Sequence, residues 1–393
     1  MLNVGENAAN SGFKPLRLTI ARNARGLKQN ELALEIGRSS ATVSKWESVD
    51  YSHSPDENDL RALSAALGVE ANWFFKELVS ENSASFFRSL RSELKSARDK
   101  TAAKLIFSYD IYDAASDHIE FPYVDVPEIE GIGDYKTLTS DQIDRIADQV
   151  REYWGLGDGP IDDIITIIEN AGIIVTDDFL VSEKLDGVSR WFSDRPVMLL
   201  AKDKNTGVRR RFDAAHELGH IVLHRNVSAE QLVEDWHLIE DQAMEFASAF
   251  LLPSSSFAHS VRDVNLDSLA NLKPIWKVSI AAMLMRLRAL NLIDADQSKN
   301  LWKYYSYRKW RGGEPHDDQI AFEQPINLGA AINMIAEGGV ADFQLFMAKV
   351  GLLPDDISSL TGVSKETFSV IAKSKPRLRL VRNVESIGRP AND

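Results

Sequence analysis

The sequence predicts an α+β protein that is predominantly helical, with its β structure confined to one central region. Short amphipathic helical patterns separated by Gly and Ser fill the N-terminal part, and helical patterns with Pro and Gly breaks fill the last third. Between them, "GIIVTDDF" predicts a short β-branched strand, and "GVSRWFS" and "PVMLLA" predict a hairpin joined across "DR". We therefore expect one small antiparallel sheet among many helices.

Composition limits the function classes. A chain of 393 residues is long enough for two or three domains, and 44% apolar with 26% charged residues is ordinary for a globular protein. Cysteine is absent, so any metal must be held by His, Asp or Glu. The N-terminal stretch is polar, and no apolar run reaches the roughly 18 residues that span a bilayer. We expect a cytoplasmic prokaryotic protein with no membrane partner.

Composition shifts along the chain suggest five segments. The last of them, which is mostly helical, is the least informative. In order, we expect a disordered tail at 1–12, a DNA-binding domain at 13–79, a helical connector at 80–135, a catalytic domain at 136–260 and a helical C-terminal domain at 261–393.

The N-terminal region has the pattern of two short helices that cross closely. In "LKQNELALEIGRSSATVSKWES", Gln29 opens one helix, Ala33 and Gly37 stand at the tight turn, and Ser39 can cap the next helix. The buried positions of this second helix are Val43 and Trp46. Its outward positions carry small or polar side chains suited to a DNA major groove: Ser40, Ala41, Thr42, Ser44 and Lys45.

Local charge supports a nucleic-acid interface in this acidic chain, whose net charge is −13. Residues 13–46 hold seven Lys or Arg against two Glu. The region resembles the helix-turn-helix domains of the XRE family, and the final "DLRALSAALGV" helix extends the resemblance. The resemblance implies that Gln29 contacts phosphate, that Ser40, Ala41, Thr42 and Lys45 face bases, and that homodimers bind paired half-sites of double-stranded operator DNA. The alternative is a helical module used only for dimerisation or protein binding.

The stretch "RRRFDAAHELGHIVLH" at 209–224 indicates a metal site. His216 and His220 lie four residues apart, on one face of a helix and about 6 Å apart along its axis, so they can share one ion. Glu217 is rotated by about 100° and can act as a base without being a ligand. His224 lies about 12 Å along the axis from His216, too far to share that ion. The small Gly219 lets a neighbouring chain approach closely, and Arg209–Arg211 are expected to pair with acidic neighbours.

Helical phase points to the third ligand in "IEDQAMEFASAFLLP". Glu240 falls in an otherwise apolar stripe, where a carboxylate is costly unless it is paired or bound to a metal. Glu245 shares the opposite face with Gln242 and Ala249, which we expect to face solvent. Glu240 is therefore the predicted ligand. The remaining alternative is an ordinary helix that happens to be rich in histidine.

The two motifs together resemble the ImmA/IrrE family of zinc metallopeptidases. The resemblance covers about 13–325, with "AAHELGH" and the "E-x-x-A-x-x-F-A-x-x-F-L-x-P" pattern from Glu240 to Pro253 as its most specific parts. It departs at Met244, where the family often has a small polar residue. The resemblance implies a zincin-like fold, with Zn²⁺ bound by His216, His220 and Glu240 and with Glu217 as the general base. Asp213 is a candidate acceptor for a ligand imidazole, and the edge strand of the hairpin can bind an extended substrate.

His224 has two possible roles: it orients substrate or Glu217, or it caps the end of the helix. Two functions remain open for the whole chain. One is a DNA-binding regulator with a zinc endopeptidase that cleaves a specific protein, such as one encoded by a neighbouring gene. Its role would lie in stress response, in control of mobile elements or in toxin–antitoxin-like control. The other is a repressor or antitoxin whose zinc fold binds or senses a partner without cleaving it.

Overall fold

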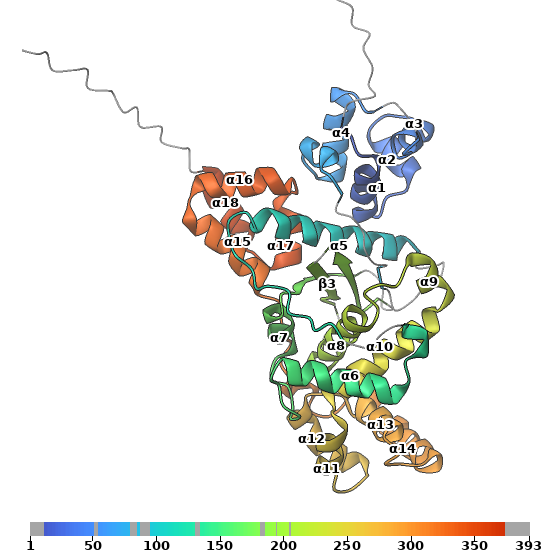
Figure 1. The fold of residues 1–393 in the computed structure, drawn as a ribbon. Coiled ribbons are helices and arrows are strands. Elements are labelled where there is room, and N and C mark those ends of the chain that lie inside the picture. Colours follow the sequence, from blue (N-terminus) through green and yellow to red (C-terminus); the bar gives the residue numbers. More distant parts are fainter. Residues whose placement is uncertain are drawn as a thin grey trace, which may run out of the picture.

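The computed structural model describes residues 12–50, 54–78, 85–86, 95–129, 134–180, 185–193, 195–203 and 206–373. The predicted tail at 1–12 lies outside this part of the chain except for Gly12, and so does much of the first third of the predicted connector. Figure 1 shows the N-terminal helices at one end, a small sheet in the centre, and helices on both sides of that sheet. In the described residues, no helix is long and apolar enough to cross a membrane.

The N-terminal unit is all-α. Ser39 caps its third helix by accepting the N–H of Thr42 at 3.1 Å, and Gly68 ends the fourth helix in the left-handed conformation. Buried Leu18, Leu32 and Val43 form its centre. Its elements are α1 (Pro15–Ala24), α2 (Gln29–Glu35), α3 (Ser40–Trp46), α4 (Glu57–Leu67) and a 3₁₀ turn (Ala71–Phe75).

A long helix, α5 (Lys95–Ala115), lies between the N-terminal unit and the sheet (Figure 1). It contacts α1 on one side and the strands on the other. Arg17 of α1 donates to Asp110 of α5 at 2.5 Å, and this carboxylate also accepts the indole N–H of Trp73 at 2.9 Å. Helix α5 is therefore a packed part of the predicted connector, and its buried Asp110 is paired across the junction.

The sheet has three strands in the order β1-β3-β2: β1 (Ile174–Asp178), β3 (Arg195–Ala201) and β2 (Gly187–Phe192). The hairpin of β2 and β3 is antiparallel, as predicted, with Phe192 opposite Arg195. The sheet as a whole is mixed, because β1 pairs with β3 in parallel, from Ile174 opposite Val197 to Asp178 opposite Ala201. The β-branched pattern of β1 predicts a strand but carries no information on its neighbour or direction. β2 is left as an edge strand.

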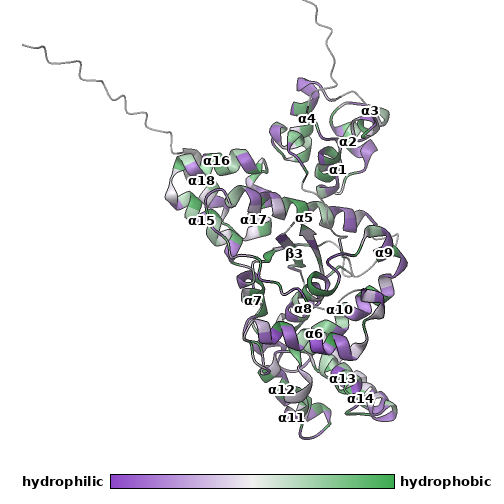
Figure 2. Cartoon of the chain, viewed as in Figure 1, coloured by the Kyte–Doolittle hydropathy of each residue, from purple (hydrophilic) through white to green (hydrophobic). Residues whose placement is uncertain are grey.

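Helices cover both faces of the sheet. Val188 and Leu199 belong to the core shared with α5, whereas Met198 and Leu200 belong to the core around α8. The second core includes α6, whose hydrophilic face is turned to the viewer in Figure 2. The helices of this side are α6 (Ser140–Tyr153), α7 (Ile164–Asn170), α8 (Gly207–Leu223), α9 (Ala229–Glu234), α10 (Trp236–Leu251), α11 (Ser254–Ser260), α12 (Leu266–Trp276), α13 (Ile280–Ala289) and α14 (Ala295–Tyr307).

The described residues of the predicted C-terminal domain, 261–373, divide between two cores. Side chains of α12–α14 join the core of α8 and α10, whereas the last helices join the core of the N-terminal unit and α5. These last helices are α15 (Asn327–Gly338), α16 (Val340–Val350), α17 (Pro354–Thr361) and α18 (Lys365–Lys373). Helical periodicity predicts each helix but not the core into which its apolar face packs.

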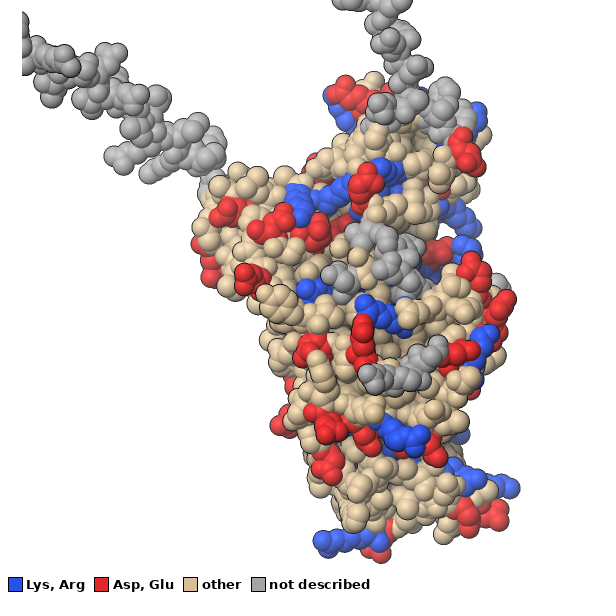
Figure 3. Space-filling model, viewed as in Figure 1, with Lys and Arg blue, Asp and Glu red and all other residues tan. Residues whose placement is uncertain are grey.

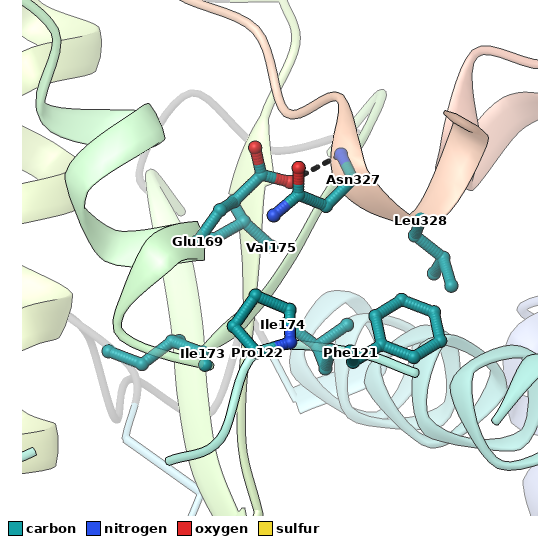
Figure 4. Close-up of a pocket in the computed structure, with 9 residues that line it drawn as sticks. Phe121, Pro122, Glu169, Ile173, Ile174, Val175, Asn327 and Leu328 are labelled. Atoms are coloured by element: carbon teal, nitrogen blue, oxygen red, sulfur yellow. Dashed lines mark hydrogen bonds between the residues drawn. The ribbon is translucent and has the colours of Figure 1, made fainter. Parts of the chain in front are cut away.

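Two buried carboxylates hold this C-terminal bundle in place. Asp356 of α17 accepts from Arg25 and from Lys104, each at 2.5 Å, and so joins the bundle to the N-terminal unit and to α5. Glu169 of α7 accepts the backbone N–H of Ile326 at 3.1 Å and that of Asn327 at 2.9 Å, at the start of α15. Figure 4 shows Glu169 and Asn327 meeting at the rim of a small pocket.

Candidate metal centre and DNA-binding surface

Two imidazoles of α8 converge on one point. His216 and His220 are four residues apart in the sequence, and their Nε2 atoms lie 3.1 Å apart. Their exposed fractions are 5% and 1%. Burial lowers the pKa of His220 to about 4, so this ring is neutral at neutral pH and one of its two nitrogens carries a free lone pair.

Glu240 of α10 completes the group. Its Oε2 lies 3.5 Å from His216 Nε2, and its Oε1 lies 3.4 Å from His220 Nε2. Within the described residues, these three side chains are the one group whose donor atoms come close enough together to hold an ion. The close crossing of α8 and α10 requires Gly219, because a Cβ there would stand 3.2 Å from the backbone of Ala243.

The donor set fits a divalent metal. Both carboxylate oxygens of Glu240 are buried and form no hydrogen bond within the described part of the chain. Burial works to raise the pKa of Glu240, but the neighbouring imidazoles outweigh it and hold this pKa below its usual range. An ionised carboxylate without hydrogen bonds is costly in a protein interior unless a cation neutralises it. Two imidazoles and one carboxylate are a zinc donor set.

Glu217 lies beside this group with its carboxyl group fixed by strand β2. Ser189 donates its hydroxyl to Glu217 Oε2 at 2.6 Å, and Glu217 is 2% exposed. Burial raises the pKa of Glu217 well above its usual value, while the hydrogen bond from Ser189 opposes that shift. A Cβ at Gly187 would lie 2.9 Å from Glu217 Oε1, so only glycine leaves room for this carboxyl group. The sequence did not point to Gly187 or Ser189, because their strand meets α8 only in the folded chain.

His224 ends α8, and its ring contacts the ring of His220 rather than Glu217. It occupies the C-cap position, and its Nδ1 lies 3.1 Å from Nδ1 of His220. Its Nε2 lies 3.0 Å from Gln242 Oε1, and the amide of Gln242 donates to the carbonyl of Tyr135 at 2.6 Å. The expectation that Gln242 faces solvent was wrong: it is 2% exposed, because α6 and residue 135 pack against that side of α10. Glu245 is exposed, as predicted.

Asp213 does not hold a ligand imidazole. Nδ1 of His216 has no hydrogen-bond partner in the described residues, and Nδ1 of His220 faces His224. Asp213 stands one turn before His216 and is 3.9 Å from Arg209. The predicted pairing of the basic run is confirmed, with Arg209 bound to Asp186, Arg210 to Asp177 and Arg211 to Glu323.

One further residue reaches the site from the connector. Phe86 donates its backbone N–H to the carbonyl of Ser189 at 3.3 Å and stacks its ring on His220 at 4.6 Å. No pattern in the sequence places this phenylalanine near the histidines, since the contact joins segments more than 100 residues apart.

The second candidate site is the outer face of α3. Val43 and Trp46 are buried, as predicted, while Ser40, Ala41 and Lys45 are exposed and Thr42 is half-buried. Gln29 stands at the first position of α2, and its amide donates to Glu47 at 2.7 Å. The C-terminal bundle contacts the N-terminal unit elsewhere, through Arg25 and residues 69–76. The expected base-facing residues thus lie on a face of α3 away from these contacts.

The positive charge of this unit is smaller than its sequence count suggests. Of the seven Lys and Arg counted at 13–46, five form ion pairs, and Figure 3 shows blue and red atoms side by side over the N-terminal unit. The pairs are Lys14–Glu77, Arg17–Asp110, Arg22–Glu47, Arg25–Asp356 and Arg38–Asp59. Glu47, Asp59 and Glu77 belong to the N-terminal unit but lie after residue 46, where the count of basic residues ended. The other two partners are Asp110 of α5 and Asp356 of α17.

Comparison with known families matches two parts of the chain. Residues 18–74 match the model of the helix-turn-helix family, and residues 168–288 match that of the IrrE N-terminal-like domain, a peptidase family. The second match runs past residue 260, the predicted domain end, and takes in α11–α13. No curated protein matched the chain. The chain therefore joins an XRE-type helix-turn-helix DNA-binding domain to a metallopeptidase-type domain of the ImmA/IrrE family.

Proposed function

We propose that this DNA-binding regulator carries a zinc-dependent endopeptidase that hydrolyses a specific partner protein. The observation that supports it most directly is the convergence of His216, His220 and the unbonded carboxylate of Glu240 beside Glu217. A purely structural metal site has no use for a buried carboxyl group at the position of Glu217. We also propose the domain limits 13–79 for DNA binding and 136–288 for the peptidase.

In this proposal, Nε2 of His216, Nε2 of His220 and the carboxylate of Glu240 hold the ion. Zinc bound there supplies Lewis acidity, which polarises the scissile carbonyl and makes water acidic enough to lose a proton near neutral pH. His224 fixes the ring of His220 from the opposite side, and Gln242 fixes His224. Two successive side chains thus orient one of the three proposed ligands, His220.

Glu217 moves the proton. Its carboxylate accepts a proton from the attacking water and delivers it to the nitrogen of the leaving amine. The raised pKa caused by burial suits a group that must both take up and release a proton. Ser189 keeps Oε2 in a fixed direction and leaves Oε1 for the transfer.

Strand β2 is the proposed docking edge for substrate. The carbonyl of Ser189 accepts a hydrogen bond from the backbone of Phe86, outside the sheet, so this edge can pair with an added strand. A cavity of about 1070 Å³ borders the far end of this strand, with Trp191, Ser193 and Tyr135 in its wall. This space is large enough for several residues of an extended protein segment.

The cleavage test compares wild-type chain with Glu217→Gln, both loaded with zinc to equal metal content. Each is incubated with candidate proteins, including the products of neighbouring genes, and new N termini are identified by mass spectrometry. We expect cleavage by the wild type alone. If both leave every candidate intact, the chain is a repressor or antitoxin that binds its partner without proteolysis.

The DNA half of the proposal is a homodimer on paired operator half-sites. Footprinting on the chain's own promoter is expected to show two protected half-sites, one helical turn of DNA or a multiple of it apart. Lys45→Ala is expected to weaken binding by about 1–3 kcal/mol if Lys45 contacts a base. Lys299→Ala, at an exposed lysine of α14, is the matched control and should leave the footprint unchanged. Equal loss in both variants would contradict a role for α3.

A further inference from the structure

The segment at Phe86 lies where a substrate strand would lie. Phe86 and Ser189 form an antiparallel bridge, with the N–H of Phe86 donated to the carbonyl of Ser189 at 3.3 Å. Ser189 belongs to the edge strand β2, and its hydroxyl holds Glu217. The chain has therefore added a backbone partner to its own docking edge, next to the proposed base.

The side chain of Phe86 fills a pocket beside the metal ligands. Its ring is parallel to that of His220, at an interplanar angle of 10°, and lies 5.8 Å from that of His224. Phe86 is 1% exposed and belongs to a small apolar cluster that is separate from the two large cores. The other buried members of this cluster are Tyr135, Val227, Leu232 and Ile239.

We propose that Phe86 is an internal ligand of the peptidase cleft, and that its pocket selects an aromatic side chain in an extended protein substrate. The proposal rests on the proposed function and names a feature of the substrate. A phenylalanine of an ordinary core would need neither the backbone bond to an edge strand nor a place against a ligand imidazole. The combination of both contacts is what a bound peptide makes.

Covalent attachment makes this ligand a strong competitor. A ligand that belongs to the same chain acts at an effective concentration of roughly millimolar. A free peptide must therefore displace the segment at Phe86 before the peptide can bind. Removing the ring of Phe86 should therefore raise the affinity for a free peptide that carries its own phenylalanine. It should not raise the affinity for a peptide that lacks one.

The test uses the full chain with Glu217→Gln, loaded with zinc, so that binding is read without cleavage. The probe is a fluorescein-labelled peptide with the sequence of residues 81–92, "ENSASFFRSLRS", and its binding is measured by fluorescence anisotropy. We expect at least tenfold tighter binding when the host also carries Phe86→Ala. A second peptide with alanine at the positions of both Phe86 and Phe87, and so without a phenylalanine, should gain less than twofold.

Phe257→Ala is the matched host control, because Phe257 is fully buried in the core around α8 and has no contact with the cluster of Phe86. Equal affinities of the parent and Phe86→Ala hosts would overturn the proposal, as would an equal gain for both peptides. If Phe86→Ala does not fold, Phe86→Leu takes its place, with a smaller gain expected. Because no cleavage is measured, failure here is distinct from failure of the peptidase proposal, which the Glu217 comparison decides.

Discussion

At the scale of single residues, the position of Glu217 depends on a glycine. A Cβ at residue 187 would lie 2.9 Å from Glu217 Oε1 and 3.1 Å from Leu200, whose side chain is buried. Gly187→Ala should therefore turn the carboxyl group away from Ser189. A displacement of about 1 Å in a catalytic group costs up to roughly 100-fold in rate, so we expect kcat on the identified substrate to fall 10- to 100-fold.

Zinc content separates this effect from damage to the metal site. The atoms nearest to a Cβ at Gly187 belong to Glu217 and Leu200 rather than to the three proposed ligands, so Gly187→Ala should bind as much zinc as the wild type. Gly312→Ala is the control, since a Cβ there meets nothing within 4 Å. An unchanged kcat in Gly187→Ala would show that the orientation of Glu217 is not required.

At the scale of elements, the crossing of α8 and α10 sets the distance between the ligands. A Cβ at Gly219 would stand 3.2 Å from Cα and O of Ala243 and from the ring of Phe246. Gly219→Val should force the helices apart, move Glu240 away from His216 and His220, and destabilise the fold by about 1–3 kcal/mol through overpacking. We expect at least a tenfold loss of zinc affinity in competition with a chelator.

The control for this change is Gly338→Val at the end of α15, where a Cβ meets nothing within 4 Å. It introduces the same β-branched side chain into a helix without a neighbour to displace. Zinc affinity should be unaffected there. If Gly219→Val also binds zinc as the wild type does, the helix crossing tolerates the extra volume and our account of the site geometry is wrong.

The same scale shows which features could be predicted from the sequence. Helical phase alone distinguished the buried Glu240 from the exposed Glu245, and a β-branched run together with a hairpin pattern predicted all three strands. Gln242 was misplaced because its burial depends on Tyr135, more than 100 residues away along the chain. Periodicity records which side of an element is apolar, but the partner that covers a polar side is set by tertiary packing. The parallel pairing of β1 and the contact of Phe86 escaped prediction for the same reason.

At the scale of the whole molecule, Asp356 links three regions. This 5% exposed carboxylate binds Arg25 of the N-terminal unit and Lys104 of α5 from its place in α17. Asp356→Asn leaves these two cations beside a neutral side chain in the protein interior. We therefore expect the free energy of unfolding to fall by about 3–5 kcal/mol. Asp355→Asn is the matched control, because Asp355 pairs with Lys365 at the surface. Chemical denaturation should show the loss for Asp356→Asn and less than about 1 kcal/mol for the control. If Asp356→Asn and Asp355→Asn lose the same free energy of unfolding, the ion pairs of Asp356 do not stabilise the junction of the three regions.

Glu169 makes the attachment of the C-terminal bundle depend on pH. Burial raises its pKa from 4.5 to about 7, although the N–H groups of Asn327 and Ile326 oppose the shift. The folded state then holds the proton more tightly than the unfolded state, so the stability contribution is complete below about pH 4.5 and is lost as pH rises through 7.

The variant Glu169→Gln tests this prediction, because its neutral side chain retains an acceptor for the helix N–H groups and does not titrate. Between pH 5 and 7.5, the free energy of unfolding of the wild type should fall relative to this variant by up to about 3 kcal/mol. Glu337→Gln, at an exposed glutamate of α15, should follow the wild type. A constant difference between the wild type and Glu169→Gln across this range would show that Glu169 is ionised throughout, with the N–H groups of α15 fully offsetting its burial.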